Sequence, residues 1–334
     1  MKKTPTSGIE YVSCPLCGAD NTELMYHMPV RQDQEGVYGQ DVWDIVQCKQ
    51  CKLIYTNPRP DASALAAYYT FANDWDYQFV QDWFIENADL QRSTWQRYLR
   101  IMHHYAPPGK LLDVGCGAGT FLLEAQKAGN QVIGQEVSPY FAAYGRTQHH
   151  LDIREGEIED ISLGDHTFDF VTAFDVIEHH PYPQKLLREM HRLLKPGGVT
   201  FITTHDIGNF YARRYGAKWR YLNPIGHLTY FTRETLQEML HNAGFRTLKV
   251  GGCHTIGETG MDESVNKVVQ FGRVILLRSL VISLYKPVTQ RFPRLARWQV
   301  RRKDGSVLDH KKLLVRAGNQ IVMDDDMVLM AVAE

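Results

Sequence analysis

The amino-acid sequence predicts an α/β fold: a doubly wound, seven-stranded parallel sheet with helices on both faces, preceded by a small metal-binding module. Strand-like and helix-like runs alternate from Lys110 onward, which is typical of such a sheet. A glycine-rich turn joins the first strand to the first helix, and four cysteines stand in two close pairs near the N-terminus. The 334 residues, 44% of them hydrophobic, can form one catalytic domain with an appendage.

The predicted elements are separated by clear turn signals. Strands are expected at Lys110–Val114, Gln131–Val137, Phe168–Phe174, Val199–Thr204, Phe245–Val250 and Met327–Ala333. Helices are expected at Phe121–Ala128, Tyr140–Gln148, Gln184–Leu194 and Arg233–Asn242. The run Lys195-Pro196-Gly197-Gly198 is a strong helix stop.

Shifts in composition divide the chain into three parts. Residues 1–60 carry the paired cysteines, residues 61–108 form an aromatic-rich helical linker or lid, and residues 109–334 form the sheet domain with a basic helical insert at residues 262–316. The net charge is −1, so the total charge does not indicate a nucleic-acid partner. Neither a signal peptide nor an apolar run of membrane-spanning length is recognisable, and we expect a cytoplasmic protein.

The glycine-rich turn has the form Gly115-x-Gly117-x-Gly119. Glycines let the backbone approach a ligand closely, and the start of the following helix offers free N–H groups. The spacing departs from a dinucleotide fingerprint, which requires a glycine where Thr120 stands. Glu136 ends the next strand, about 20 residues further on, where a carboxylate can accept hydrogen bonds from ribose hydroxyls.

Four stretches in order resemble the successive motifs of class I S-adenosylmethionine-dependent methyltransferases: DVGCGAG, VIGQEVSP, FDFVTAFDVIEHH and LLREMHRLLKPGG. The resemblance covers residues 110–250 and implies a Rossmann-like domain that binds S-adenosylmethionine. It implies contacts to the methionine part of the cofactor from Asp113, Gly115, Gly117 and Gly119, and to the ribose from Glu136. It places Glu157 and Ile158 at the adenine, and Phe174 and Asp175 beside the sulfonium.

The paired cysteines are Cys14, Cys17, Cys48 and Cys51, in a CxxC…CxxC pattern. Two thiolates at this spacing can reach one ion from one turn, and two such turns complete a closed, structural zinc site. The long gap between the pairs fits a ribbon with an inserted hairpin. Together with Asn57-Pro58-Arg59-Pro60 and Tyr68-Tyr69, the second pair resembles the zinc-ribbon leader of some bacterial methyltransferases, sugar methyltransferases among them. Cys116 and Cys253 are expected in the core.

Methyl transfer is an in-line displacement, so the protein has to align the nucleophile and, for a hydroxyl, remove its proton. Histidine is the usual base near neutral pH. The candidate bases lie after predicted strands or before the helix at Arg233: His179, His180, His205 and His227. His179 and His227 are favoured, and Asp206 is a candidate to orient one of them. The sequence does not decide between the two.

The methyl acceptor stays open. Many N-methyltransferases that act on nucleic-acid bases carry an Asn/Asp-Pro-Pro-Tyr stretch after the fourth strand, where this chain reads Ala173-Phe174-Asp175-Val176. This difference favours an oxygen or carbon of a small molecule, and the leader favours a sugar or glycoconjugate. The first alternative is an RNA methyltransferase whose zinc ribbon reads RNA, and the second is a scaffold without enzymatic activity. The sequence gives no indication of the oligomeric state.

The segment from Ser264 to Lys303 contains ten basic residues and no acidic ones, with apolar residues between them. One interpretation is a helical cap on the substrate crevice. The other is a helix on the membrane surface, which would bring the enzyme to a lipid-linked substrate at the inner face of the membrane. A nucleic-acid-binding face is the least favoured interpretation.

Overall fold

The computed structural model describes residues 8–30, 42–65, 88–252, 300–301, 307–308 and 326–333. The chain divides into two compact units, Met1–Gly251 with Asp325–Glu334, and Gly252–Asp324. In the second unit, β13 (Val300–Arg301) pairs antiparallel with β14 (Val307–Leu308). The rest of the predicted basic insert, Cys253 and residues 66–87 of the predicted linker lie outside the described residues.

The first unit is built on a seven-stranded sheet with the order β12–β15–β10–β9–β6–β7–β8. Its strands are β6 (Lys110–Val114), β7 (Gln131–Glu136), β8 (Ile153–Glu155), β9 (Phe168–Phe174), β10 (Leu194–His205), β12 (Phe245–Gly252) and β15 (Asp326–Ala333). Strands β10, β9, β6, β7 and β8 are parallel, whereas β15 is antiparallel to β10. The winding reverses between β6 and β9, and ligands of such sheets bind where the carboxyl ends of the strands meet this switch point.

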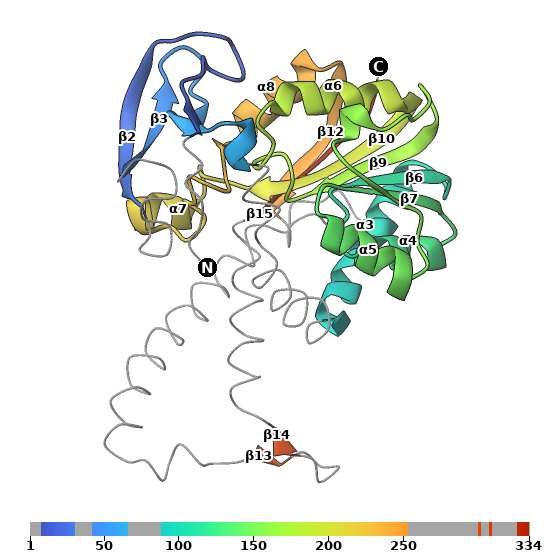
Figure 1. The fold of residues 1–334 in the computed structure, drawn as a ribbon. Coiled ribbons are helices and arrows are strands. Elements are labelled where there is room, and N and C mark those ends of the chain that lie inside the picture. The colour runs from blue at the N-terminus through green and yellow to red at the C-terminus, as the bar shows by residue number, and fades with distance from the viewer. Residues whose placement is uncertain are drawn as a thin grey trace. The chain divides into compact units, whose positions relative to one another are not determined.

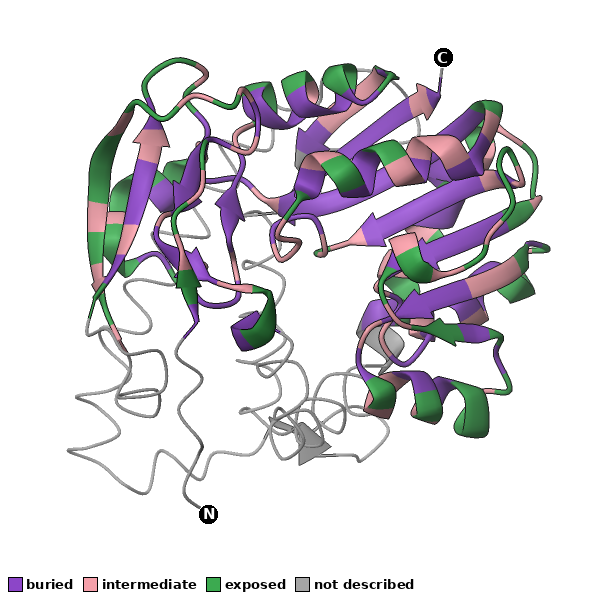
Figure 2. Cartoon of the chain, turned by 45° about the horizontal axis from the view of Figure 1, so that its top comes forward, coloured by how far each residue is buried: buried purple, intermediate pink, exposed green. Residues whose placement is uncertain are grey.

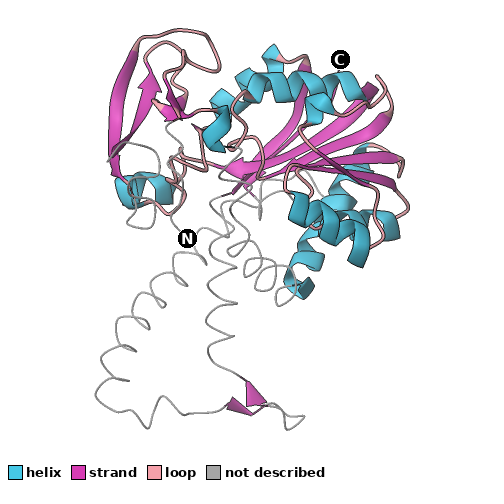
Figure 3. Ribbon diagram, viewed as in Figure 1, coloured by secondary structure: helices cyan, strands magenta, loops and turns pink. Residues whose placement is uncertain are grey.

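Helices cover both faces of the sheet (Figure 1; Figure 3). One face carries α3 (Ala88–Tyr105), α4 (Thr120–Lys127) and α5 (Pro139–Gln148), and the other carries α6 (Pro183–Leu193) and α8 (Arg233–Asn242). The central strands are buried along most of their length (Figure 2), as expected for a parallel sheet between two helical layers.

The amphipathic pattern of α6 explains why it forms and how it packs. Its buried residues recur at helical spacing along one side: Pro183, Leu186, Leu187, Met190 and Leu193. Each buried aliphatic side chain of this size contributes roughly 1.5–3 kcal/mol relative to exposure. The proline at the start of the helix has no N–H to leave unpaired.

A second, four-stranded sheet has the order β11–β4–β3–β2. The N-terminal module supplies β2 (Thr22–Pro29), β3 (Val42–Cys48) and β4 (Ile54–Thr56), and the sheet domain supplies β11 (Thr229–Tyr230). Strands β2 and β3 form the antiparallel hairpin inserted between the cysteine pairs. Because Tyr230 pairs with Ile54 and Thr229 with Tyr55, the module is continuous with the segment that precedes α8.

The predicted fold class is confirmed, and three details differ from the sequence-based expectation. Strand β8 was not predicted because only Ile153 of its three residues is buried and apolar. The Lys195–Gly198 run does follow the end of α6, but it lies inside β10, where the register with β9 shifts between Leu194 and Val199. The last strand, predicted as one more strand of a parallel sheet, runs antiparallel.

Candidate functional site

The glycine loop follows β6 with three residues in the left-handed region: Gly115 (φ 63°), Gly117 (φ 55°) and Gly119 (φ 83°). Side chains at two of these positions would also collide with neighbours. A Cβ on Gly115 would lie 2.5 Å from Val176 Cγ2, and one on Gly119 would lie 2.4 Å from Leu151 Cδ1. The loop therefore requires glycine for its backbone conformation and for its close packing against the strand ends.

Glu136 links the glycine loop to the next helix. Its Oε2 accepts a hydrogen bond from Gly117 N at 2.7 Å, and its Oε1 accepts one from Ser138 N at 2.8 Å. The Ser138 hydroxyl in turn caps α5 by accepting from Phe141 N. A carboxylate has about four acceptor positions, so these two bonds leave capacity for ribose hydroxyls.

Two further polar groups are buried at the same strand ends. Asp113 is 2% exposed and accepts a 2.6 Å hydrogen bond from the Thr172 hydroxyl. Burial raises its pKa to about 8, and the charge of Glu136 acts in the same direction. Gln135 accepts from Gly115 N and donates to Gly156 O, which ties the glycine loop to the end of β8. The sequence analysis did not identify Gln135; a buried amide directly before the predicted ribose carboxylate was the available signal.

A cleft opens at these strand ends. The residues predicted for the cofactor and for the base both contribute to its walls, which include Gly115, Gln135, Glu157, Ile158, His179 and His180. Ile158 is 1% exposed and fixed in the wall, whereas Glu157 is exposed. The cleft thus joins the predicted cofactor side to the histidine that follows β9.

Phe174 and Asp175 end β9 in different surroundings. The Phe174 ring packs among aromatic side chains, with centroids 4.6 Å from Phe121 and 5.0 Å from Trp95. Asp175 is exposed, has a φ of 54°, and accepts a hydrogen bond from the Thr203 hydroxyl. Packing from α3 and α4 therefore holds Phe174, while Asp175 presents a carboxylate at the strand end.

His179 and His227 lie together beside the cleft, with ring centroids 4.7 Å apart. His179 Nδ1 is 2.9 Å from Gly226 O, and His227 Nδ1 is 2.7 Å from Tyr221 O. Because a carbonyl oxygen only accepts, both Nδ1 atoms carry the proton and donate, and both Nε2 atoms keep a lone pair. Burial lowers the pKa of His179 to about 4 and that of His227 well below its ordinary value, so both rings are neutral at pH 7.

The other two candidate histidines have separate surroundings. His205 stacks on Tyr221 with ring centroids 3.5 Å apart, and its Nε2 is 3.7 Å from Glu178 Oε1. His180 Nδ1 accepts from Tyr182 N, and its Nε2 lies 3.6 Å from Glu159. His205 thus adjoins the pair formed by His179 and His227, whereas His180 belongs to a different cluster.

The carboxylate that adjoins the histidines is Glu178 rather than Asp206. Asp206 accepts from Gly208 N and from Arg233 Nε, so its prediction as the group that orients a histidine is wrong. Glu178 is 2% exposed and was not predicted as a site residue. Burial raises its pKa to about 7. An acid next to a histidine at the end of an apolar strand was the signal in the sequence.

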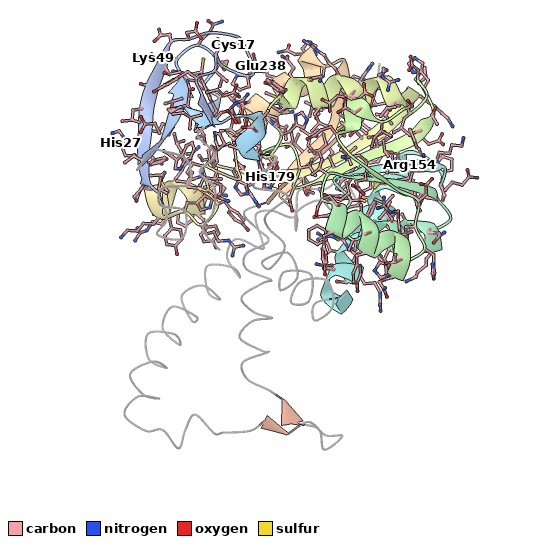
Figure 4. All side chains as sticks on the ribbon, viewed as in Figure 1. Cys17, His27, Lys49, Arg154, His179 and Glu238 are labelled. Carbon is pink, nitrogen blue, oxygen red and sulfur yellow. The ribbon has the colours of Figure 1, made fainter. Side chains whose placement is uncertain are left out.

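The cysteine pairs converge as predicted from their spacing. Sulfur–sulfur distances are 3.4 Å between Cys14 and Cys51 and 3.6 Å between Cys17 and Cys48, and the four sulfurs all lie within 4.8 Å of one another. Four thiolates around one tetrahedral zinc ion at 2.3 Å would be about 3.8 Å apart. The cluster can hold such an ion. Figure 4 shows Cys17 in the N-terminal module and His179 between that module and the seven-stranded sheet.

The segment that carries His227 is held between the two sheets. Thr56 N donates to Leu228 O, and the Thr56 hydroxyl donates to His227 O at 3.3 Å. From the other side, Leu228 N and Thr229 N donate to Glu178 O. Hydrogen bonds from the N-terminal module and from the end of β9 therefore fix the position of His227 relative to His179.

Within the described residues, no helix is both long and apolar enough to span a membrane.

Part of the chain is similar to known methyltransferases. Residues 87–250 match a family model described as a methyltransferase domain. A malonyl-[acyl-carrier protein] O-methyltransferase from Pectobacterium atrosepticum is 33% identical over 118 residues, which are 35% of this chain and 46% of that protein. A ubiquinone biosynthesis O-methyltransferase from Coxiella burnetii is 31% identical over 156 residues, 43% of this chain and 66% of that protein.

Among solved structures, a SAM-dependent methyltransferase from Archaeoglobus fulgidus aligns with a TM-score of 0.45 and 19% identity, covering 73% of this chain and 93% of that one. The chain spans less than two thirds of the length of both curated relatives named above. Residues 87–250, just under half of the chain, thus match a methyltransferase domain model, and parts of the same region are similar to two O-methyltransferases.

Proposed function

We propose that the chain transfers the methyl group of S-adenosylmethionine to a hydroxyl oxygen of a small molecule. The observation that carries the proposal is the pair His179 and His227, which each keep an Nε2 lone pair; His179 lines the cleft, and the His227 ring lies next to His179. The bound cofactor supplies an electrophilic methyl group on a sulfonium. The two curated relatives named above are both O-methyltransferases by name, which supports an oxygen acceptor.

The geometry supports the following roles for the chain's own residues. The glycine loop, Asp113 and Glu136 would bind the cofactor, since they line or support the strand ends where its ribose and methionine parts are expected. The histidine cluster would orient the acceptor hydroxyl and take its proton, because a neutral imidazole with a free Nε2 is a competent base. The backbone carbonyls of Gly226 and Tyr221 hold the two rings in the required tautomer.

A sugar or glycoconjugate is the acceptor class we propose, on the resemblance of the cysteine-rich leader to that of sugar methyltransferases. Methylation at carbon is the alternative for the same substrate class. A hydroxyl acceptor needs a base, whereas a carbon acceptor also needs an acidic C–H bond next to a carbonyl group. The O-methyltransferase names of the relatives favour oxygen.

The four cysteines would hold a structural zinc ion, because four thiolates leave no open coordination position. This ion would stabilise the turn that precedes β2 and the turn between β3 and β4. Since β4 pairs with β11, the module would also support the segment that carries His227.

The experiment is incubation of the full chain with methyl-labelled S-adenosylmethionine and a pool of sugars, nucleotide sugars, phenols and RNA, followed by mass spectrometry. We expect a labelled product that is lost in His227→Gln. Cofactor binding without any labelled product would favour the scaffold alternative. Labelling of RNA instead, with salt-dependent RNA binding, would favour the RNA methyltransferase.

A further inference from the structure

Glu178 carries a buried carboxylate oxygen that has no hydrogen-bond partner among the described residues. Its Oε2 accepts from the Thr204 hydroxyl at 2.8 Å, but Oε1 is unpaired. His205 Nε2 lies 3.7 Å from Oε1, beyond hydrogen-bonding distance. A buried polar atom without a partner destabilises a fold by about 1–3 kcal/mol, and more when it is charged. The unpaired oxygen indicates a ligand that the protein atoms do not supply.

Two imidazoles lie close to this carboxylate. One nitrogen each of His179 and His227 and one oxygen of Glu178 all lie within 4.8 Å of one another. The Nδ1 atoms of both rings are engaged with backbone carbonyls, so Nε2 is the nitrogen with a lone pair on each ring. The three residues therefore offer two neutral nitrogen ligands and one oxygen ligand around a common point.

The hydrogen-bond partners of these three side chains are of the kind that orient metal ligands. A ligating histidine usually donates its other N–H to a carbonyl or carboxylate, and a ligating carboxylate is itself hydrogen-bonded. Here Gly226 O and Tyr221 O accept from the two histidines, and Thr204 donates to the second oxygen of Glu178. Each of the three side chains is therefore held in position by a hydrogen bond on the side away from the shared point.

We propose that Glu178, His179 and His227 bind one divalent first-row transition cation at the edge of the cleft. Two imidazoles and one carboxylate are a ligand set for such ions and leave coordination positions open. His179 also lines the cleft, so the open positions are available to a hydroxyl group of the acceptor or to water. This site is distinct from the four-cysteine cluster in ligand type and in place.

The consequence for the reaction rests on the proposed function. A divalent cation makes a bound hydroxyl more acidic and orients it, so the cation would activate the acceptor oxygen. His179 and His227 would then act as ligands, and His205, which adjoins Glu178, would remain as the imidazole that can take the proton.

A second cluster of similar composition provides an internal control. Glu157, Glu159 and His180 also bring three potential ligand atoms within 4.8 Å of one another. There, however, Lys185 lies 3.7 Å from Glu159, and His180 Nδ1 already accepts from Tyr182 N. A lysine already pairs with one carboxylate of this cluster and the His180 Nδ1 lone pair is occupied, so the cluster is not expected to bind a metal ion.

The test is to titrate the full chain, with zinc retained in the ribbon, with a divalent ion. Binding of Mn²⁺ is measured by electron paramagnetic resonance. Binding of Co²⁺ is measured in a parallel titration by optical absorption. We expect about one bound ion per chain. Glu178→Gln, which keeps an acceptor for Thr204, and His227→Gln should each weaken binding at least about tenfold. Glu159→Gln should leave binding unchanged, and circular dichroism checks that each variant is folded.

The proposal is overturned if neither ion binds to the wild-type chain, or if Glu159→Gln weakens binding while folded Glu178→Gln does not. Because the titration needs neither cofactor nor acceptor, its outcome is independent of methyl transfer. A chain that binds the ion but methylates nothing would contradict the proposed function and leave the metal site standing. A chain that methylates its acceptor without binding either ion would contradict the metal site and leave the proposed function standing.

Discussion

The two sides of the cleft are built in different ways. On the cofactor side, the glycine loop and Glu136 come from two adjacent strands and 22 consecutive residues, Gly115–Glu136, and the contacts between them are hydrogen bonds to backbone N–H groups. On the acceptor side, Glu178, His205 and His227 come from three separate segments, and a strand of the N-terminal module helps to hold the last one. The cofactor side thus depends on local backbone conformation, whereas the acceptor side depends on the assembly of two sheets.

The largest expected effect is a loss of methyl-transfer rate without a loss of cofactor affinity, which would show that the two sides of the cleft act separately. In His227→Gln, the Nε2 lone pair next to His179 is lost, whether it acts as a base or as a metal ligand. We expect methyl transfer to fall by about 10²–10⁴. S-adenosylmethionine affinity should stay within error of wild type, because no cofactor residue contacts His227 through the bonds described above. Calorimetry measures the cofactor affinity, and a transfer assay on the same preparation measures the methyl-transfer rate. Equal losses of affinity and rate would show that the two sides are not separable.

The second prediction concerns the cofactor side. Glu136→Ala removes the acceptor of Gly117 N and Ser138 N and the expected acceptor of the ribose hydroxyls. Each hydrogen bond to a charged group contributes about 1.5–3 kcal/mol, so cofactor affinity should fall by one to two orders of magnitude. Calorimetric titration with S-adenosylhomocysteine measures this. Glu155→Ala, which changes an exposed acid on the neighbouring strand β8, is the matched control.

The third prediction follows from the raised pKa of Asp113. In the free protein this pKa is about 8, so the carboxyl group is mostly protonated below pH 8. A cofactor ammonium group beside it favours the carboxylate, and binding below that pH must therefore release a proton. Affinity should rise with pH, by up to about tenfold per unit between pH 6 and 7. Asp113→Asn should flatten this dependence; an unchanged slope in the variant would assign the proton to another group.

The smallest expected effect tests the link between the sheets. Thr56→Val keeps the shape of a fully buried side chain but removes the hydroxyl that donates to His227 O. One neutral hydrogen bond contributes about 0.5–1.5 kcal/mol. We expect a several-fold loss of methyl transfer with unchanged cofactor affinity. If transfer is unaffected, the backbone bond from Thr56 N to Leu228 O is sufficient to position the segment.

The same contrast explains which parts of the molecule could be predicted from the sequence. The glycine loop was recognisable because its conformation is dictated by consecutive residues, and the cysteine pairs were recognisable because their spacing reflects one turn each. Glu178 was missed because its burial depends on β10 and on the segment before β11, which are distant in sequence. Strand β8 was missed because its pairing with β7, rather than its own composition, makes it a strand.

The most direct test of the account is to disrupt the zinc ribbon in Cys17→Ser and to measure cofactor affinity and methyl transfer on the same sample. The substitution removes one thiolate of the cluster and leaves the cleft residues in place. If the ribbon supports the acceptor side through β4 and β11, methyl transfer should fall at least about tenfold, as for the loss of a group that orients a catalytic residue. S-adenosylmethionine should still bind with wild-type affinity. Undiminished transfer, or a parallel loss of cofactor binding in a folded protein, would contradict the account.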